Sequence, residues 1–189
     1  MNGVKGIENK TKQPNKKTAR NVVDATGRTS MHRKKQENST KIERKMDRRD
    51  VESTGRHIMY FEPGENDLTE FDPDYCIIHL DQDIAPGGYG WVFPKAENKV
   101  NIGLGVEKSI LEQRNKRLGK QDNVASLMEE YLQRNKAIKN AKLSQDSEDI
   151  NNNTGVFQVS VRRQNDCLVS GGYVLVGDSP WMPQPIDAG

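Results

Sequence analysis

The chain has 189 residues, a formal net charge of +2 and a hydrophobic content of 33%, and its mean hydropathy of −0.89 is low for a compact domain of that length. No apolar run approaches the roughly 18 residues of a membrane-spanning helix, and no hydrophobic signal region follows Met1, so we expect neither a spanning helix nor secretion. The polar composition favours either partial disorder or a fragment that shares its core with absent segments of a longer cytoplasmic protein.

Charge is unevenly distributed along the chain. Residues 1–56 carry 16 Lys and Arg against 7 Asp and Glu, whereas residues 57–189 carry 13 against 20. A nucleic-acid surface is one interpretation of the basic part. However, the first aromatic residue is Tyr60, so the basic part has no Phe, Tyr or Trp on which a base could stack. We expect a solvated face and no nucleic-acid partner, with contact to anionic lipid head groups as a third interpretation.

Two short strands are expected near the N-terminus. Residues 3–10 predict a short strand that enters a polar turn, and the polar residues 10–19 would form a loop or a hairpin tip. Residues 19–27 predict a second strand, which ends in a turn of small residues at 24–27. A strand that stops sharply at small residues often brings its backbone close to a ligand. The charged residues 31–56 that follow show weak helical periodicity.

The middle of the sequence predicts an antiparallel sheet. β-Branched and aromatic residues recur there in short runs, and in two of the runs large side chains alternate with small or polar ones. Pro94 and a hairpin loop at residues 96–99 separate these two runs. This pattern is typical of a multi-stranded antiparallel sheet with one apolar face. The expected strands are residues 56–61, 75–80, 88–93, 100–106 and 156–161.

The strand at 88–93 holds three of the eleven aromatic residues in the chain. Because Tyr89, Trp91 and Phe93 follow a period of two, we expect their side chains to share one face of the strand. Three aromatic rings on one face form a flat apolar wall. Such a wall is either part of a core or the lining of a pocket for a large apolar molecule, and the pattern leaves both interpretations open.

One amphipathic helix is expected near residues 122–140, with Asp122 as its cap. Its apolar stripe has the spacing i, i+3, i+4, i+7 and consists of Val124, Leu127, Met128, Tyr131 and Leu132. Beyond a polar loop at 144–153, residues 173–178 predict a strand that ends in Gly-Asp. Such a strand and its Pro/Gly-rich loop should lead into a helix. Because the sequence stops at Gly189, we expect a chain cut from a longer protein.

Gly177 and Asp178 form a candidate ligand site. A carboxylate directly after a buried strand can accept hydrogen bonds from ligand hydroxyls, and the glycine permits close approach of the ligand to the backbone. Taken alone, the pair fits a turn with an Asx hydrogen bond at least as well.

Four stretches in a fixed order are more specific: VVDATG, PGGYGWVFP, NIGLGV and YVLVGD. This order resembles the geranylgeranyl reductase family of FAD-dependent enzymes, particularly its archaeal digeranylgeranylglycerophospholipid reductases, within the p-hydroxybenzoate-hydroxylase-like class. The substrate-side signature of that family has the form PxxYxWxFP, eight residues and GxG. Its seven positions are filled here by Pro86, Tyr89, Trp91, Phe93, Pro94, Gly103 and Gly105.

The resemblance implies that these seven residues bind substrate, with the aromatic strand lining a cavity for an isoprenoid chain beside the flavin. A polyprenyl chain offers almost no hydrogen bonds, so its binding depends on buried apolar surface, at roughly 25 cal/mol per Å2. The resemblance also implies FAD as the cofactor, with Asp178 on the ribityl hydroxyls. The implied cofactor contacts are Ala25, Gly27, Gly177, Asp178, Pro185 and Gly189.

The family's opening strand–GxGxxG–helix unit is absent from this sequence, and so are its C-terminal helices. The expected fold class is therefore an α+β or α/β flavoprotein fragment. It would contain an antiparallel substrate-domain sheet with one or two helices and the returning strands of a Rossmann-like FAD-binding domain. We expect the end of a β hairpin and a returning strand in residues 1–30, the substrate-binding domain in 31–165, and a strand with its Gly-Asp loop from the FAD domain in 166–189.

For the complete protein, the resemblance implies FAD-dependent saturation of isoprenoid double bonds in the geranylgeranyl lipids of archaeal membranes. Its partners would be a prenyl lipid and an electron donor such as NADPH or ferredoxin, with peripheral contact at the inner face of the membrane. No His, Cys or Glu in the motif region stands out as a proton donor, and none is assigned. Two alternatives stay open: an FAD-dependent aromatic hydroxylase or halogenase-type monooxygenase, and a catalytically incompetent fragment.

Overall fold

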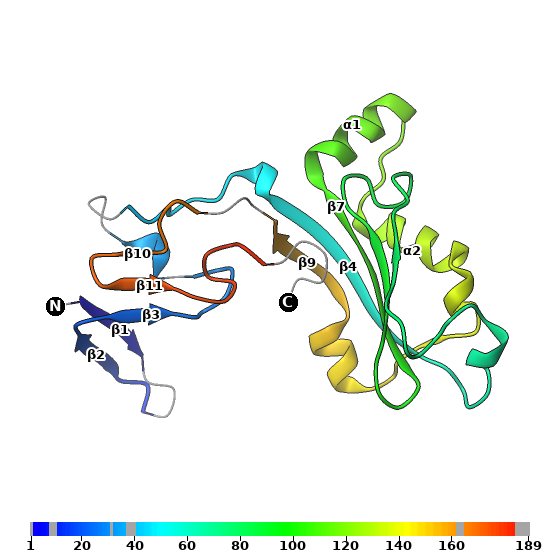
Figure 1. Ribbon diagram of the computed structural model, residues 1–189, viewed down its shortest axis with the longest axis horizontal. Helices are drawn as coiled ribbons and strands as arrows, with labels where there is room; N and C mark the ends of the chain where they lie inside the picture. The colour runs from blue at the N-terminus through cyan, green and yellow to red at the C-terminus, as the bar shows by residue number, and fades with distance from the viewer. Residues whose placement is uncertain (1, 8–10, 31, 37–40, 162–164, 184–189) are drawn as a thin grey trace. The chain divides into compact units, whose positions relative to one another are not determined.

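A computed structural model describes residues 2–7, 11–30, 32–36, 41–161 and 165–183 of the chain (Figure 1). The chain divides into two compact units: the first comprises Met1–Val51 with Ser160–Gly189, and the second comprises Glu52–Val159. These limits differ from the sequence-based boundaries, which assigned 31–51 and 160–165 to the substrate-binding domain. The difference arises because the sheet of the second unit starts with β4 (Val51–Tyr60) and ends with β9 (Gly155–Ser160).

The second unit is built on a six-stranded sheet (Figure 1). The strand order is β5-β6-β7-β4-β8, and β9 pairs with β4 off this path. Each neighbouring pair along the path is antiparallel, which confirms the predicted sheet. The further strands are β5 (Ile77–His79), β6 (Gly90–Pro94), β7 (Lys99–Glu107) and β8 (Lys142–Leu143). The expected start of β4 at residue 56 is wrong, because the strand already pairs with β7 from Glu52 onward.

The β6–β7 hairpin has the predicted loop. Glu97 and Asn98 both adopt positive φ angles, of 62° and 57°. Two successive residues with positive φ are typical of a type I′ turn, whose twist matches that of paired strands. The Lys95 N–H donates to the Lys99 carbonyl over 2.8 Å and closes the hairpin.

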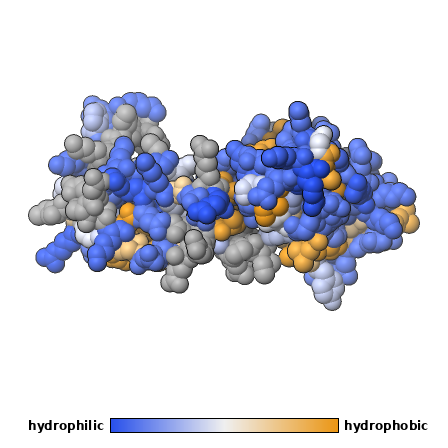
Figure 2. Space-filling view, turned by 90° about the horizontal axis from the view of Figure 1, so that it is seen from above, coloured by the Kyte–Doolittle hydropathy of each residue, from blue (hydrophilic) through white to orange (hydrophobic). Residues whose placement is uncertain are grey.

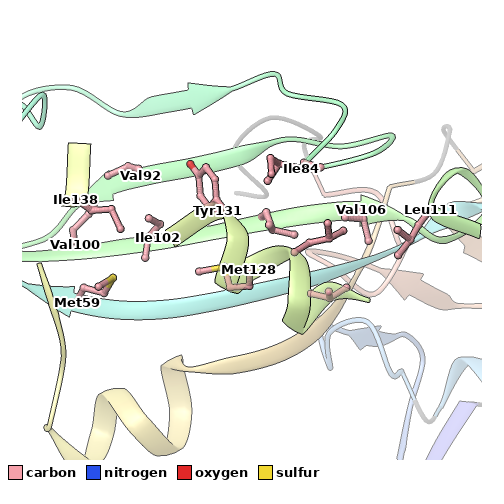
Figure 3. Packing of buried hydrophobic residues seen from close by; sticks show 14 of the residues in the cluster. Met59, Ile84, Val92, Val100, Ile102, Val106, Leu111, Met128, Tyr131 and Ile138 are labelled. Carbon is pink, nitrogen blue, oxygen red and sulfur yellow. The ribbon is translucent and has the colours of Figure 1, made fainter. Parts of the chain in front are cut away.

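Two helices follow β7 in the sequence: α1 (Lys108–Leu118) and α2 (Val124–Arg134). The hydrophobic core lies between the sheet and α2, where Val92, Ile102 and Leu104 are fully buried against Leu127 and Met128. Figure 3 shows Val92, Ile102 and Met128 in this core. We call this side of the sheet the helix face. The predicted stripe of α2 is confirmed in this core, whereas α1 was not anticipated from the sequence.

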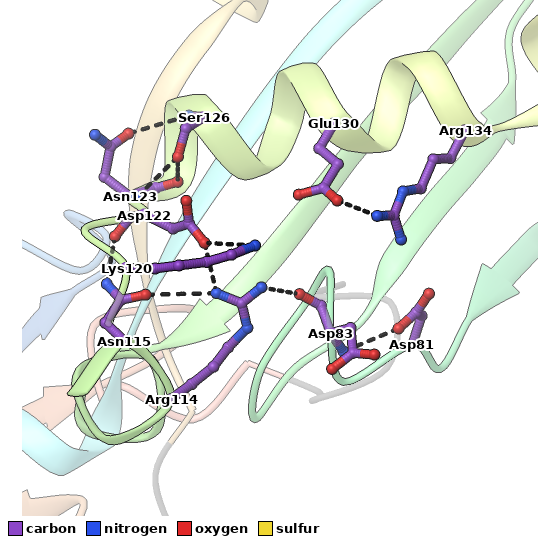
Figure 4. Close-up of polar contacts among 10 residues, drawn as sticks. All are labelled: Asp81, Asp83, Arg114, Asn115, Lys120, Asp122, Asn123, Ser126, Glu130 and Arg134. Atoms are coloured by element: carbon purple, nitrogen blue, oxygen red, sulfur yellow. Dashed lines mark hydrogen bonds and ion pairs between the residues drawn. The ribbon is translucent and has the colours of Figure 1, made fainter. Parts of the chain in front are cut away.

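The predicted cap of α2 is wrong by one residue. Asn123 is the cap, and its side chain accepts from the N–H groups of Ala125 and Ser126 at 2.9 and 3.1 Å. Asp122 instead accepts from the Arg114 guanidinium at 2.6 Å (Figure 4). Arg114 is 6% exposed and also donates to the Asp83 carbonyl, so Asp122 neutralises a buried cation between α1 and the loop before β6.

The first unit contains two smaller sheets. β3 (Val22–Asp24) pairs in parallel with β11 (Tyr173–Leu175), and β11 pairs antiparallel with β10 (Val169–Ser170). β1 (Asn2–Ile7) and β2 (Pro14–Ala19) form an antiparallel hairpin. The expected loop at 10–19 is therefore largely a strand. Its polar sequence hid this because every residue of β2 is exposed and carries no alternating apolar pattern.

The remaining elements are short. They are the 3-10 turns Arg33–Lys35, Arg48–Asp50, Asn66–Leu68 and Lys136–Ile138, and the π turn Asp149–Asn153. Throughout the described ranges, no helix is long and apolar enough to cross a membrane. The surface in Figure 2 is mostly hydrophilic with scattered apolar groups. Large apolar side chains exposed in the segment before and around β5 include Leu68, Tyr75 and Leu80.

Candidate active site

The aromatic residues lie on the face of the sheet opposite the helix face. Val92 is buried against the helices, so its neighbours Trp91 and Phe93 point to the other side of β6. The ring centroids of Tyr89 and Trp91 are 6.1 Å apart, as are those of Trp91 and Phe93. All three side chains are half-buried, and none belongs to the core cluster on the helix face. We call this side, marked by Tyr89, Trp91 and Phe93, the aromatic face.

Gly103 provides the floor on which the Trp91 indole lies. The two residues are directly opposed in the β6–β7 register. A Cβ on Gly103 would stand 2.3 Å from Cζ2 of Trp91 and 2.4 Å from the carbonyl oxygen of Gly55. The indole also donates from Nε1 to the Asn101 side chain over 3.2 Å. The first glycine of GxG is therefore required for the flat position of the ring.

Gly105 is the second glycine on this face. Its N–H donates to the Tyr89 carbonyl over 2.9 Å, which places Tyr89 on one flank. Thr54 is directly opposite on β4, and the nearest side-chain atom to a Cβ on Gly105 would be Oε2 of Glu52, at 3.1 Å. The second glycine thus lets the Glu52 carboxyl and Thr54 approach the β7 backbone closely, next to Tyr89.

The two prolines of the signature frame the strand. Pro86 is fully buried, and its carbonyl accepts from the Glu107 N–H over 3.0 Å. Pro94 is the last residue of β6 and lies opposite Val100. The structure thus brings all seven signature residues together on β6, on β7 and at the end of the preceding loop, although the prolines hold the strand in place more than they contribute to its face.

A pair of carboxylates borders the aromatic face, and the sequence reasoning missed it. Glu52 and Glu107 are directly opposed on β4 and β7. Burial of Glu52 raises its pKa and the neighbouring charge of Glu107 raises it further, to about 7. Glu107 caps α1, where its carboxylate accepts from the Ser109 N–H at 2.9 Å. Only the β4–β7 register, which joins residues far apart in the sequence, could have revealed this pair.

A cation lies on the same face further along β4. Arg56 is opposite Gly103, and its guanidinium carbon is 4.8 Å from the centroid of the Phe157 ring. Burial lowers the pKa of Arg56. The aromatic face therefore combines apolar rings with a pair of carboxyl groups and an arginine, a composition suited to a mostly apolar ligand that carries a polar end.

The predicted cofactor residues of the first unit follow two neighbouring parallel strands. β3 leads into Ala25 and Gly27, and β11 leads into Gly177 and Asp178. Ligands of open α/β sheets bind beyond the carboxyl ends of parallel strands. Gly27 and Gly177 have φ angles of 73° and 60°, and a Cβ on either would meet no atom within 4 Å. Ala25, Gly177 and Asp178 are exposed. Pro185 and Gly189, also predicted as cofactor contacts, lie outside the described residues.

Asp24 holds the two strand ends together. Its buried carboxylate accepts from the hydroxyls of Ser30, Thr26 and Tyr173, and its carbonyl accepts from the Ser179 hydroxyl. Burial of Asp24 raises the pKa, but the hydrogen bonds outweigh that effect and lower it to about 2. Asp24 is therefore an ionised structural residue, which leaves the exposed positions around it for a ligand.

The arrangement of these elements is shared with flavin-dependent enzymes. A crystal structure described as geranylgeranyl bacteriochlorophyll reductase-like, from Thermoplasma acidophilum, matches with a TM-score of 0.70 at 24% identity, over 95% of this chain and 38% of that one. A myxobacterial chondrochloren halogenase, described as a variant of FAD-dependent halogenases, matches with a TM-score of 0.63 at 14% identity, over 98% and 38% of the two chains. The fold class expected from the sequence is thereby confirmed.

The chain belongs to the geranylgeranyl reductase family, whose catalytic-domain model matches residues 50–145, just over half of the chain. The digeranylgeranylglycerophospholipid reductase of Sulfolobus acidocaldarius is 38% identical over 86 residues, which are 46% of this chain and 18% of that protein. The corresponding protein of Thermoplasma volcanium is 34% identical over 120 residues, or 64% of this chain and 26% of that protein. The chain thus spans about a quarter or less of these relatives.

Proposed function

We propose that this chain is the substrate-side part of a longer, FAD-dependent enzyme that saturates the isoprenoid double bonds of geranylgeranyl lipids. One observation carries the proposal: the aromatic face is a wall of three half-buried rings over a glycine floor, outside the hydrophobic core of the second unit. A polyprenyl chain can bind such a wall through burial alone, because it has almost no groups to hydrogen-bond.

The first unit supports FAD as the cofactor. Its parallel strands β3 and β11 end side by side, with exposed positions at Gly177 and Asp178 and unfilled space above Gly27. These residues fit one edge of a dinucleotide site. Asp178 would accept hydrogen bonds from cofactor hydroxyls, and the two glycines would allow the backbone to approach it. When bound, reduced flavin would supply the hydride for alkene reduction.

The partners follow from this reaction. They are a prenyl lipid, an electron donor such as NADPH or ferredoxin, and a membrane surface from which the lipid is taken. The protein residues would bind the chain and exclude water from the reacting carbons. We place this enzyme in the cytoplasm, in peripheral contact with the inner face of the cell membrane.

The alternative function is a flavin-dependent monooxygenase or halogenase. The structural likeness to the chondrochloren halogenase over 98% of this chain supports this alternative, because one fold can serve both chemistries. The two functions differ in the molecule with which reduced flavin reacts: an alkene in the reductase, and oxygen in the monooxygenase or halogenase. A hydroxylated or halogenated product would contradict the reductase.

The test uses the full reading frame that contains these residues. It should be purified as a yellow flavoprotein, reduced without oxygen and mixed with a geranylgeranyl glycerolipid. We expect mass spectrometry to show two added hydrogen atoms for every saturated bond. The chain of 189 residues should be purified in parallel, and its flavin absorbance reports whether these residues alone retain the cofactor. A full-length protein without flavin, or flavin that is oxidised without change to the lipid, would contradict the proposal.

A further inference from the structure

Glu52 and Glu107 occupy one end of the aromatic face, and their surroundings are unequal. Glu107 accepts three hydrogen bonds: from the Ser109 N–H at 2.9 Å, the Ser109 hydroxyl at 2.7 Å and the Ile110 N–H at 3.2 Å. Donors at a helix N-terminus favour the charged form of a carboxylate. The Glu107 carboxylate is thus tied to the start of α1, and Glu52 is the member of the pair whose pKa is raised.

The Glu52 carboxyl also lies over the second glycine of the aromatic face. Its Oε2 is 3.1 Å from the point where a Cβ of Gly105 would stand, and the Tyr89 backbone pairs with Gly105 from the other strand. An apolar chain lying along Tyr89 and Trp91 would cross this glycine. The carboxyl of Glu52 would then border the chain from the side opposite the rings.

The other groups on this face do not offer such a proton. The strand register places Glu107 and Lys99 of β7, Arg56 and Tyr60 of β4 and Lys142 of β8 on it, and Tyr89 joins them just before β6. Lys142 pairs with Glu62 at 3.1 Å. Lys99 lies at the far end of the face and is bound to Asp149 at 2.8 Å. Arg56 stays cationic at any ordinary pH, and a phenol has a pKa near 10.

We propose that Glu52 is the general acid of the reaction and delivers the proton that completes saturation of the alkene. This inference rests on the proposed function. A hydride from reduced flavin would bond to one alkene carbon. The π electron pair would form the second C–H bond with the Glu52 proton, and the resulting carboxylate would regain a proton from solvent. Reduced flavin is the reductant, so the atoms and electrons balance.

The acidity of Glu52 suits this role. A glutamate with its ordinary pKa would be ionised at neutral pH and could not donate. Burial and the Glu107 charge raise the pKa of Glu52 to about 7, so roughly half of the enzyme carries the proton at neutral pH.

The experiment compares three variants of the full-length, flavin-loaded enzyme: Glu52→Gln, Glu52→Asp and, as a matched control on the exposed side of α2, Glu129→Gln. We expect Glu52→Gln to lower the rate of lipid saturation about 100-fold, a typical effect of removing a general acid. Flavin content and flavin reduction by the electron donor should not change. Glu52→Asp should retain part of the rate, and Glu129→Gln all of it.

Two pH measurements complete the test. The wild-type rate should fall above a pH of about 7, and this limb should be absent in Glu52→Gln. Independently of activity, carbon-13 NMR of glutamate carboxyls should show one group with a midpoint near 7 in the wild type and none in Glu52→Gln.

The outcomes separate the two proposals. An active wild type together with an active Glu52→Gln of unchanged pH profile overturns the role of Glu52 and leaves the reductase function standing. A carboxyl midpoint of Glu52 near 4 also overturns that role. A full-length wild type that saturates no lipid overturns the proposed function, and the role of Glu52 with it.

Discussion

Alanine at Gly103 should damage the aromatic face, whereas alanine at Gly105 should be tolerated. At Gly103 the new methyl group would lie 2.3 Å from the Trp91 indole and 2.4 Å from the Gly55 carbonyl oxygen. Ordinary contacts are about 3.5 Å or longer, so the indole must move by about 1 Å and the β4 backbone cannot yield without straining its pairing with β7. We expect the free energy of unfolding to fall by about 3 kcal/mol, near the upper end for overpacking.

The matched variant separates this clash from a general effect of alanine in a strand. At Gly105 the nearest atom would be the flexible Glu52 carboxylate at 3.1 Å, so we expect a change within about 1 kcal/mol. Urea unfolding followed by circular dichroism and by tryptophan fluorescence would measure both variants. Adding Trp91→Ala to Gly103→Ala should restore only part of the stability, because the Gly55 carbonyl remains. Equal stability of Gly103→Ala and Gly105→Ala would refute the close approach of the indole to β7.

Three further predictions concern stability. The raised pKa of Glu52, about 7 against 4.5, costs the folded state up to about 3 kcal/mol above neutral pH and little below pH ~4. Because Glu52 is partly exposed, the full cost is not expected: Glu52→Gln should raise the free energy of unfolding by about 2 kcal/mol at pH 8 and hardly at pH 4. Urea unfolding measures this, and an equal effect at the two pH values would contradict the raised pKa of Glu52. The lowered pKa of Asp24 contributes stability above pH ~4, and this stability is lost toward pH 2. Asp24→Asn should therefore destabilise the first unit by about 2 kcal/mol at pH 7. Hydrogen exchange near Tyr173 would measure the loss, and unchanged protection there would contradict it. Asn98 has a φ of 57°, an angle that glycine adopts without steric cost, so Asn98→Gly should raise the free energy of unfolding by about 0.5 kcal/mol. Thermal unfolding should show a higher midpoint, and a lower one would argue against the type I′ turn.

The sequence predicts well what depends on neighbours along the chain. The β6–β7 hairpin, with the alternation of Trp91 and Phe93 and its loop at 96–99, depends only on local spacing. The structure has this hairpin, although β6 covers Gly90–Pro94 where a strand over 88–93 was expected. The apolar stripe of α2 is likewise local. By contrast, α1 was missed because it begins directly at the end of β7 with Glu107 as its cap, outside the usual Ser, Thr, Asp and Asn signals.

The parts of the candidate site that depend on local sequence spacing were predictable, and those that depend on strand pairing were not. The signature identifies Trp91 and Gly103, but it does not say why the glycine is there; only the register opposes the two residues and brings a backbone carbonyl within reach. Glu52 lies outside the signature, on a strand whose start was placed too late. Its altered acidity depends on Glu107, a partner fixed by β4–β7 pairing alone.

The two faces of β6 and β7 explain why the aromatic pattern left two interpretations open. Alternation shows that Trp91 and Phe93 share a face, but not which face is covered by helices. In the structure, α2 covers the face of Val92 and Ile102, so these smaller side chains form the core. The larger aromatic rings are thereby left on the other face, above two glycines. A strand that used its largest residues for packing would bury them under the helix, so their position opposite the core is itself an argument that they bind a ligand.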